Sequence, residues 1–156
     1  MTDTTLTIDT ILTPELTLCR VPGSSKKRIL EFISEEIQRG YPELSDSQIF
    51  NNLVSRERLG STGIGQGIAI PHCRLEGCDR VIGVLVTLEE GVAFDAIDNQ
   101  PVDLLFTLIV PKEATSEHLE LLSQLAEKFN DHNFCDQLRQ CTDSDTLYKR
   151  MIGANQ

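Results

Sequence analysis

The residues best suited to chemistry lie in one stretch, residues 60–74, which reads GSTGIGQGIAIPHCR. Its apolar run at 68–70 is long enough only for a short buried strand, so His72 is expected just past a strand end. Imidazole has an unperturbed pKa of about 6.5, which leaves it mostly neutral and nucleophilic near pH 7. His72 is therefore the predicted reactive group, although a histidine after a strand can equally be a hydrogen-bonded loop residue.

The loop before this strand combines glycines with two hydroxyl side chains, and glycine lets a backbone approach another group closely. We predict that it forms a phosphate loop through Ser61, Thr62, Gly63, Gly65 and Gly67. It lacks the Gly-Lys-Ser/Thr ending of a Walker A sequence. Its GxGxG spacing follows a helix and not a strand, so a dinucleotide fingerprint is also a poor fit.

A second histidine and an arginine are predicted to reach the same place. His118 lies in the first turn of the helix expected after a strand at 104–110, and Arg56 lies near the end of the helix before the glycine loop. Anionic ligands collect at the carboxyl ends of strands in α/β sheets. If the two strands are neighbours and point the same way, His72 and His118 meet there. The alternatives are a core histidine at His118 and a simple partner of the helix dipole at Arg56.

This combination suits phosphoryl transfer to a histidine, whose transition state spreads charge over three equatorial oxygens. His72 is the expected nucleophile. Arg56 would bind the phosphoryl oxygens with its planar fork, and His118 would donate a further hydrogen bond or position the substrate. No cofactor is expected, since the donor can arrive already activated.

The cysteines predict neither a metal site nor a disulfide framework. His72, Cys73 and Cys78 do not have a recognised zinc spacing, and no fourth ligand is evident. The five cysteines are an odd number at irregular positions, which is typical of a reducing compartment. Buried or incidental thiols are the better interpretation.

The hydrophobic pattern predicts one α/β domain with a mixed or partly parallel sheet, helices coming first, then strands, then helices. The first 23 residues are expected to be a frayed start followed by short irregular or extended pieces. Helices are predicted at about 24–39, 45–58, from 115 or 116, at 134–140 and at 143–152, and strands at 68–70, 81–88 and 104–110.

Composition narrows the class of partner. The chain has 156 residues, 40% of them hydrophobic, with a formal net charge of −10. Such an acidic chain is a poor nucleic-acid binder but can dock onto basic protein partners. Neither a signal peptide nor an apolar run of about 20 residues is present in the sequence, so we expect no membrane insertion and a cytoplasmic location.

A longer run of residues resembles the active-site signature of the fructose/mannitol-type enzyme IIA domains of the bacterial phosphoenolpyruvate-dependent phosphotransferase system. Residues 56–65 read RERLGSTGIG and residues 67–72 read GIAIPH. Further matches are AFDAIDNQPVDLLF at 93–106 and EHL at 117–119. The chain is most similar to the nitrogen-related branch of these proteins, over nearly its whole length.

The resemblance implies a fold and a set of roles. It implies a mannitol-type IIA fold, a central mixed sheet of roughly five strands with helices on both sides, as one EIIA type-2 domain over residues 6–152 with flexible termini at 1–5 and 153–156. His72 would be the phosphorylated residue, supported by Arg56 and His118. The donor would be an HPr-like phosphocarrier (NPr), and the protein would signal by its phosphorylation state in nitrogen, potassium or carbon regulation, with transporters or sensor kinases as targets.

Two alternatives remain open within this interpretation. One is a sugar-specific IIA that passes its phosphate to a IIB domain, and the other is a binding module that regulates its targets whether or not it is phosphorylated. Cys73 is a departure from the family pattern, in which glycine often follows the active histidine. Its side chain is expected to narrow access to His72 or tune its environment without abolishing transfer.

Overall fold

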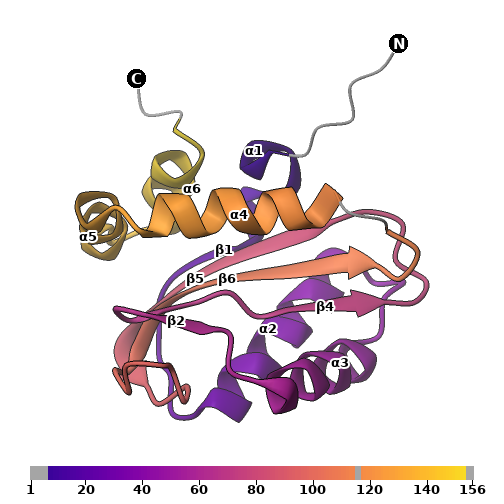
Figure 1. Ribbon diagram of the computed structural model, residues 1–156. Helices are drawn as coiled ribbons and strands as arrows, with labels where there is room; N and C mark the ends of the chain where they lie inside the picture. The colour runs from indigo at the N-terminus through magenta and orange to yellow at the C-terminus, as the bar shows by residue number, and fades with distance from the viewer. Residues whose placement is uncertain (1–6, 115–116, 154–156) are drawn as a thin grey trace.

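The computed structural model describes residues 7–114 and 117–153, in which helices cover both faces of one sheet (Figure 1). The helices are α1 (Ile8–Ile11), α2 (Lys26–Gly40), α3 (Asp46–Leu59), α4 (Glu117–Phe129), α5 (His132–Gln140) and α6 (Ser144–Ile152), with a 3-10 turn at Pro14–Leu16. The strands are β1 (Thr17–Val21), β2 (Gly63–Gly65), β3 (Ile68–Ala69), β4 (His72–Leu75), β5 (Ile82–Val92) and β6 (Val102–Pro111).

The sheet is mixed, and β6 is its central strand. Within the described residues the strand order is β1-β5-β6-β3-β2, and β4 also pairs with β6. Strands β3 and β4 lie one after the other along the same edge of β6, both parallel to it, while β5 is antiparallel to β6 on the other edge. The chain therefore runs along β6 twice in short pieces, and His72 opens the second of them.

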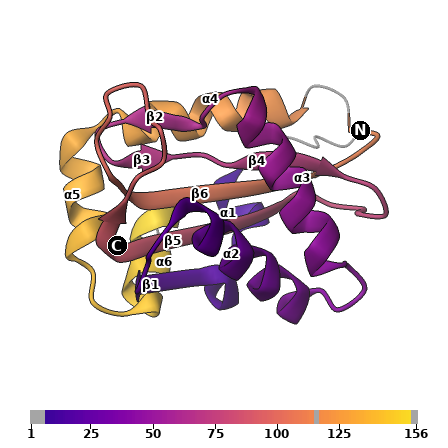
Figure 2. The same ribbon diagram turned by 90° about the horizontal axis from the view of Figure 1, so that it is seen from below.

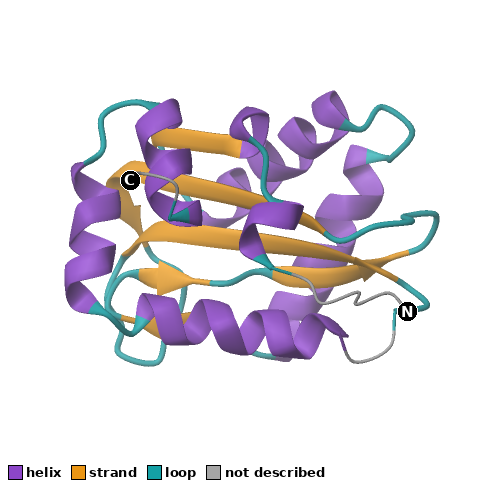
Figure 3. Cartoon of the chain, turned by 90° about the horizontal axis from the view of Figure 1, so that it is seen from above, coloured by secondary structure: helices purple, strands orange, loops and turns teal. Residues whose placement is uncertain are grey.

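Two apolar layers hold the helices against the sheet. Helices α2 and α3 lie on one face, and α1, α4, α5 and α6 lie on the other (Figures 1 and 3). Side chains alternate along β5, so Val84 and Val86 belong to the first layer and Leu85 to the second. Buried leucines and isoleucines fill both layers, which fixes α3 and α4 on opposite sides of β4 and β6.

Capping side chains mark the starts of α2 and α3, the two helices of the first layer. Ser25 accepts a hydrogen bond from the backbone N–H of Arg28 at the start of α2, and Ser45 accepts one from Gln48 at the start of α3. Buried Ile29, Ile33 and Ile37 then follow at four-residue spacing on α2. Both helices lie close to the predicted ranges.

The predicted fold class is confirmed, with differences in detail. The sheet has six strands in the described residues and not about five, and two of these strands, β2 and β3, are only three and two residues long. The segment expected to hold short irregular or extended pieces contains the short helix α1 and β1, an extended edge strand paired in parallel with β5. The predicted helix start at 115 or 116 and the termini expected to be flexible lie outside the described residues, except Gly153, which ends α6 with φ 77°.

None of the helices in residues 7–114 and 117–153 is both long enough and apolar enough to cross a membrane.

Candidate functional site

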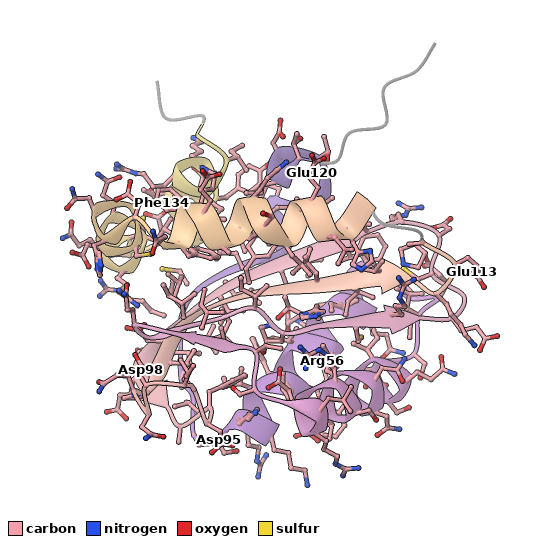
Figure 4. All side chains as sticks on the ribbon, viewed as in Figure 1. Arg56, Asp95, Asp98, Glu113, Glu120 and Phe134 are labelled. Atoms are coloured by element: carbon pink, nitrogen blue, oxygen red, sulfur yellow. The ribbon has the colours of Figure 1, made fainter. Side chains whose placement is uncertain are left out.

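His72, Arg56 and His118 line one cleft with a volume of about 680 Å³. His72 is the first residue of β4, Arg56 lies in the last turn of α3, and His118 is the second residue of α4. Figure 2 shows α3 crossing beside β4, and Figure 4 shows Arg56 where the two approach each other. The remaining lining residues are Gln48, Asn52, Ser55, Leu59, Cys73, Arg74, Leu75, Glu76, Val110 and Lys112.

The sheet register explains why the two histidines meet. Strand β4 is parallel to β6, with His72 opposite Leu108, so both strands carry the chain toward the same edge. Strand β6 ends at Pro111 and α4 begins at Glu117. The chain therefore turns back at that edge of the sheet and places His118 there. The two strands are neighbours and point the same way, as the sequence interpretation required.

One hydrogen bond fixes the chemistry of His72. Its Nδ1 lies 2.9 Å from the backbone carbonyl oxygen of Ile70. A carbonyl can only accept, so Nδ1 carries the proton and the neutral ring keeps its lone pair on Nε2. The chain thus selects Nε2 as the nucleophilic nitrogen. His72 lies three residues after the end of β3, just past a strand as predicted, and it also opens the next strand, β4, which was not predicted.

The surroundings of His72 favour its neutral form. Burial of the half-buried ring is the main cause that lowers its pKa below the usual value of 6.5. The hydrogen bond to Ile70 acts in the opposite direction, and the charges of Arg56 and His118 lower the pKa further while Glu57 raises it. The net direction is downward, so the nucleophile is available at neutral pH.

We therefore expect His72 to titrate below 6.5, because folding penalises its protonated form. Between this lowered pKa and 6.5 the unfolded chain binds more protons, so the free energy of unfolding falls as the pH falls through that window. An NMR titration of the ring in the folded protein, and in the same chain unfolded by urea, measures both values. A folded value equal to or above the unfolded one would contradict this account.

One hydrogen bond holds the Arg56 side chain in place and leaves other N–H donors of its guanidinium available. Its Nη1 donates to the carbonyl oxygen of Gly60, 2.9 Å away, and the side chain is half-buried. Guanidinium has five N–H donors in a fixed fork, so others remain for an anion in the cleft. Arg56 can therefore offer two parallel hydrogen bonds to phosphoryl oxygens.

His118 is nearly buried, with 9% of its surface exposed, and its Nδ1 has no hydrogen-bond partner among the described residues. No described contact fixes its tautomer, so its Nε2 is able to donate or to accept. Its position above the leucines of α4 is consistent with the core interpretation, but the ring also lines the cleft.

The structure does not bring the glycine loop into this cleft. Gly65 and Gly67 flank the turn of the β2–β3 hairpin, where Gln66 accepts a hydrogen bond from Arg139 and donates one to Asp98. Along β6, Ile68 pairs with Leu104 and His72 with Leu108, so the turn lies at the far end of the sheet, as the position of Asp98 in Figure 4 also shows.

Ser61, Thr62 and Gly63 are also absent from the cleft lining. The Ser61 hydroxyl donates to the carbonyl oxygen of Phe94, 2.6 Å away, and accepts from the backbone N–H of Gly63. Thr62 donates its hydroxyl to Glu57. These hydroxyls are engaged in closing the turn after α3, so the geometry favours a structural role for this loop over phosphate binding.

Two cations in the cleft were missed by the sequence interpretation. Arg74 and Lys112 both line it, and the Arg74 guanidinium donates to the carbonyl oxygens of Lys112 and Ala114. The available signal was the period of two along a strand, which places Arg74 on the same side of β4 as His72. That signal could not be used because His72 was expected just past the end of a strand and not within one.

Cys73 packs into the core beneath the cleft. It is 7% exposed and belongs to the apolar layer on the α2 and α3 face, and burial raises the pKa of its thiol to about 12. Because neighbouring side chains in a strand point to opposite faces, Cys73 packs mainly away from the face that carries His72. It limits the floor of the cleft and carries no charge near neutral pH.

We expect Cys73 to react slowly with iodoacetamide in the folded protein at pH 8, because only the thiolate reacts and almost none is present four pH units below its pKa. Unfolding in urea should make it react at the rate of an ordinary thiol. A peptide-resolved mass-spectrometric time course measures this. Equal rates in the folded and unfolded chain would contradict the buried assignment.

No group of three or more histidine, cysteine or acidic side chains in residues 7–114 and 117–153 is placed to hold a metal ion.

Comparison with known proteins identifies the family. Residues 10–152 match the family described as phosphoenolpyruvate-dependent sugar phosphotransferase system, EIIA 2. The chain belongs to this family and is a phosphotransfer component of that system.

Within the family, the chain is similar to nitrogen regulatory proteins. It is 50% identical over 145 residues to the nitrogen regulatory protein of Pseudomonas aeruginosa, covering 93% of this chain and 94% of the relative. The crystal structure of the nitrogen regulatory protein IIA-Ntr from Neisseria meningitidis superimposes with a TM-score of 0.86 at 40% identity, over 93% of this chain and 97% of that one. The mannitol IIA of Escherichia coli shares the fold, with a TM-score of 0.70 at 21% identity over 86% and 95% of the two chains.

Proposed function

We propose that the protein is a regulatory phosphocarrier that accepts a phosphoryl group from an HPr-like carrier (NPr) on Nε2 of His72. The observation that carries the proposal is the hydrogen bond between Nδ1 of His72 and the Ile70 carbonyl oxygen, in a cleft shared with Arg56 and His118. It leaves a neutral imidazole with one free lone pair, next to positive groups, and family membership supports phosphoryl chemistry at this site.

The transfer step needs no metal and no net proton movement. The lone pair of Nε2 attacks the phosphorus of the carrier's phosphohistidine, a new N–P bond forms, and the N–P bond of the carrier breaks, so that its imidazole leaves. When the carrier ring is protonated on its other nitrogen, it leaves as neutral imidazole. His72 retains the proton on Nδ1, and the Ile70 carbonyl oxygen stabilises the positive ring that results.

The other groups of the cleft bind the transferred phosphoryl group. Arg56 donates from its fork to the equatorial oxygens, where charge is spread in the transition state. His118 donates one hydrogen bond from the start of α4, and Arg74 and Lys112 add positive charge at the rim. These donors compensate the two negative charges that enter the cleft.

Regulation follows from the change in charge. Phosphorylation adds a phosphoryl group with about two negative charges to a ring that keeps its Nδ1 proton and becomes positive, so the site gains about one net negative charge. This change can repel one partner and attract another. Exposed Leu59, at the end of α3 beside the cleft, gives a partner an apolar contact. We propose that the protein acts in the cytoplasm in this way on transporters or sensor kinases, in nitrogen, potassium or carbon regulation.

A second candidate function is that of a sugar-specific IIA that passes its phosphate to a IIB domain. The mannitol IIA fold favours it, but the likeness to that protein is at 21% identity, whereas the nitrogen regulatory relative is 50% identical. Incubating the phosphorylated protein with a purified fructose-type IIB domain distinguishes the two. Rapid transfer to the IIB would favour the sugar-specific role.

The experiment that tests the proposal is intact-mass spectrometry after incubation with phosphoenolpyruvate, enzyme I and NPr. We expect a single phosphoryl adduct that is lost in acid, as phosphohistidine is. The reaction without NPr is the control, since transfer from enzyme I alone should be slow. No adduct in the presence of an active carrier would favour the phosphorylation-independent binding module.

A further inference from the structure

A buried carboxylate lies next to the proposed phosphoryl-transfer site. The transfer step described above does not use this carboxylate. Glu57 follows Arg56 in the last turn of α3, and only 5% of its side chain is exposed. Burying an ionised carboxylate is costly unless cations or hydrogen-bond donors compensate its charge. The groups that contact Glu57 therefore indicate the structural role of its charge.

Three donors converge on the carboxylate. Its Oε1 lies 2.9 Å from the ammonium of Lys26 and accepts the backbone N–H of Thr62 at 3.1 Å. Its Oε2 accepts the hydroxyl hydrogen of Thr62. One side chain thus connects the end of α3 to the start of α2 and to the segment that follows α3.

Lys26 is itself held by the surrounding residues. Its ammonium lies 4.7 Å from the centroid of the Phe94 ring and 3.4 Å from the Phe94 carbonyl oxygen, which also accepts the Ser61 hydroxyl. The first residue of α2 is a position where the helix dipole disfavours a cation. The ion pair with Glu57 and the contact with Phe94 compensate for that.

The turn at residues 57–62 contains the carbonyl oxygen that binds the Arg56 guanidinium. Residue Gly60, between Glu57 and Thr62, accepts the hydrogen bond from Nη1 of Arg56. We propose that Glu57, held by Lys26, is a positioning residue that fixes the turn at 57–62 and thereby the Arg56 guanidinium opposite His72. This inference rests on the proposed function, because it assigns Glu57 to the same phosphoryl-transfer site.

The same carboxylate also acts on His72 through its charge. Arg56 and His118 lower the pKa of His72 and Glu57 raises it, while Arg74, Glu76 and Lys112 are the other charged groups of the cleft. Removal of the Glu57 charge should therefore lower the pKa of His72. This shift follows from the charge of Glu57 alone, whereas a loss of kcat follows only if the carboxylate also positions Arg56, so the two measurements together separate the two effects.

The central variant is Glu57→Gln, which keeps an oxygen that can accept from Thr62 but removes the charge that holds Lys26. We expect kcat for phosphoryl acceptance from phosphorylated NPr to fall roughly 10- to 100-fold, with KM for the carrier little changed. We also expect His72 to titrate at a lower pH by NMR. Asp95→Asn is the matched control, because Asp95 lies 4.0 Å from the same ammonium but is 88% exposed, and it should leave both values unchanged.

For a second variant we expect the opposite change in the pKa of His72. Lys26→Met leaves the Glu57 carboxylate without its cation, so His72 should titrate at a higher pH, and this test remains available if Glu57→Gln does not fold. Wild-type kcat in a folded Glu57→Gln, or an unchanged titration in a folded Lys26→Met, would overturn the inference.

The His72 titration needs no phosphodonor. Failure of the proposed function and failure of the positioning role of Glu57 therefore give different results. If the proposed function is wrong, neither the natural protein nor any variant is phosphorylated, while the shifts in His72 titration remain. If the positioning role is wrong, the natural protein is phosphorylated and Glu57→Gln matches it in rate.

Discussion

His72→Ala should abolish phosphorylation by NPr, because the variant lacks the one imidazole whose Nε2 lone pair is directed to the cleft by a hydrogen bond to the chain. The fold should survive, since His72 is half-buried at the start of a short strand and lies outside both apolar layers. The measurement is the mass of the intact protein after incubation with phosphoenolpyruvate, enzyme I and NPr.

His132→Ala is the matched control for this loss. His132 is exposed at the start of α5 and lines none of the cleft, so this variant should be labelled like the natural protein. Labelling of His72→Ala at the natural rate would show that another residue accepts the phosphoryl group. Loss of labelling in both variants would show that the effect is not specific to His72.

Arg56→Ala should slow phosphoryl acceptance by roughly 10²- to 10³-fold, which is the usual cost of removing one donor that stabilises charge in a transition state. The main effect should be on kcat, because the role proposed for Arg56 is to bind the phosphoryl group and not the surface of the carrier. Arg56→Lys should recover part of the rate, since it restores the charge but not the planar fork. Single-turnover kinetics with phosphorylated NPr measures these rates.

Arg58→Ala controls for the loss of a positive charge at the same helix end. Arg58 is exposed and lines a separate cleft between α2 and α3, so its removal should leave the rate nearly unchanged. Equal rates for Arg56→Ala and the natural protein would remove Arg56 from the mechanism. Equal losses in both arginine variants would indicate general attraction of the carrier and not contact with the phosphoryl group.

Local signals in the sequence were sufficient for most helices and for the meeting of the site residues. Ser25 and Ser45 begin the helices that they were predicted to cap, and the spacing of isoleucines on α2 identified its buried face. His72 and His118 could be brought together because strand ends and helix starts share one edge of a parallel pair. The family signature then raised these residues above their core and loop alternatives.

The remaining features depend on contacts between distant segments, which local patterns do not contain. Strand β1 is short and becomes a strand only by pairing with β5, about 68 positions away at Thr17 and Leu85. The sequence could not place the glycine loop relative to the cleft, because positive φ serves a hairpin turn as well as a phosphate site: Gly65 and Gly67 have φ 99° and 82° at the turn. The pairing of Glu57 with Lys26 likewise joins two helices and leaves no pattern along the chain.

The most direct test of the account is to identify the ring nitrogen that carries the phosphoryl group. A two-dimensional ¹H–¹⁵N multiple-bond correlation spectrum of the phosphorylated protein distinguishes Nε2 from Nδ1 and assigns the residue. The account predicts phosphorylation at Nε2 of His72, because Nδ1 donates to the Ile70 carbonyl oxygen. A phosphoryl group on Nδ1 of His72, or on His118, would contradict it.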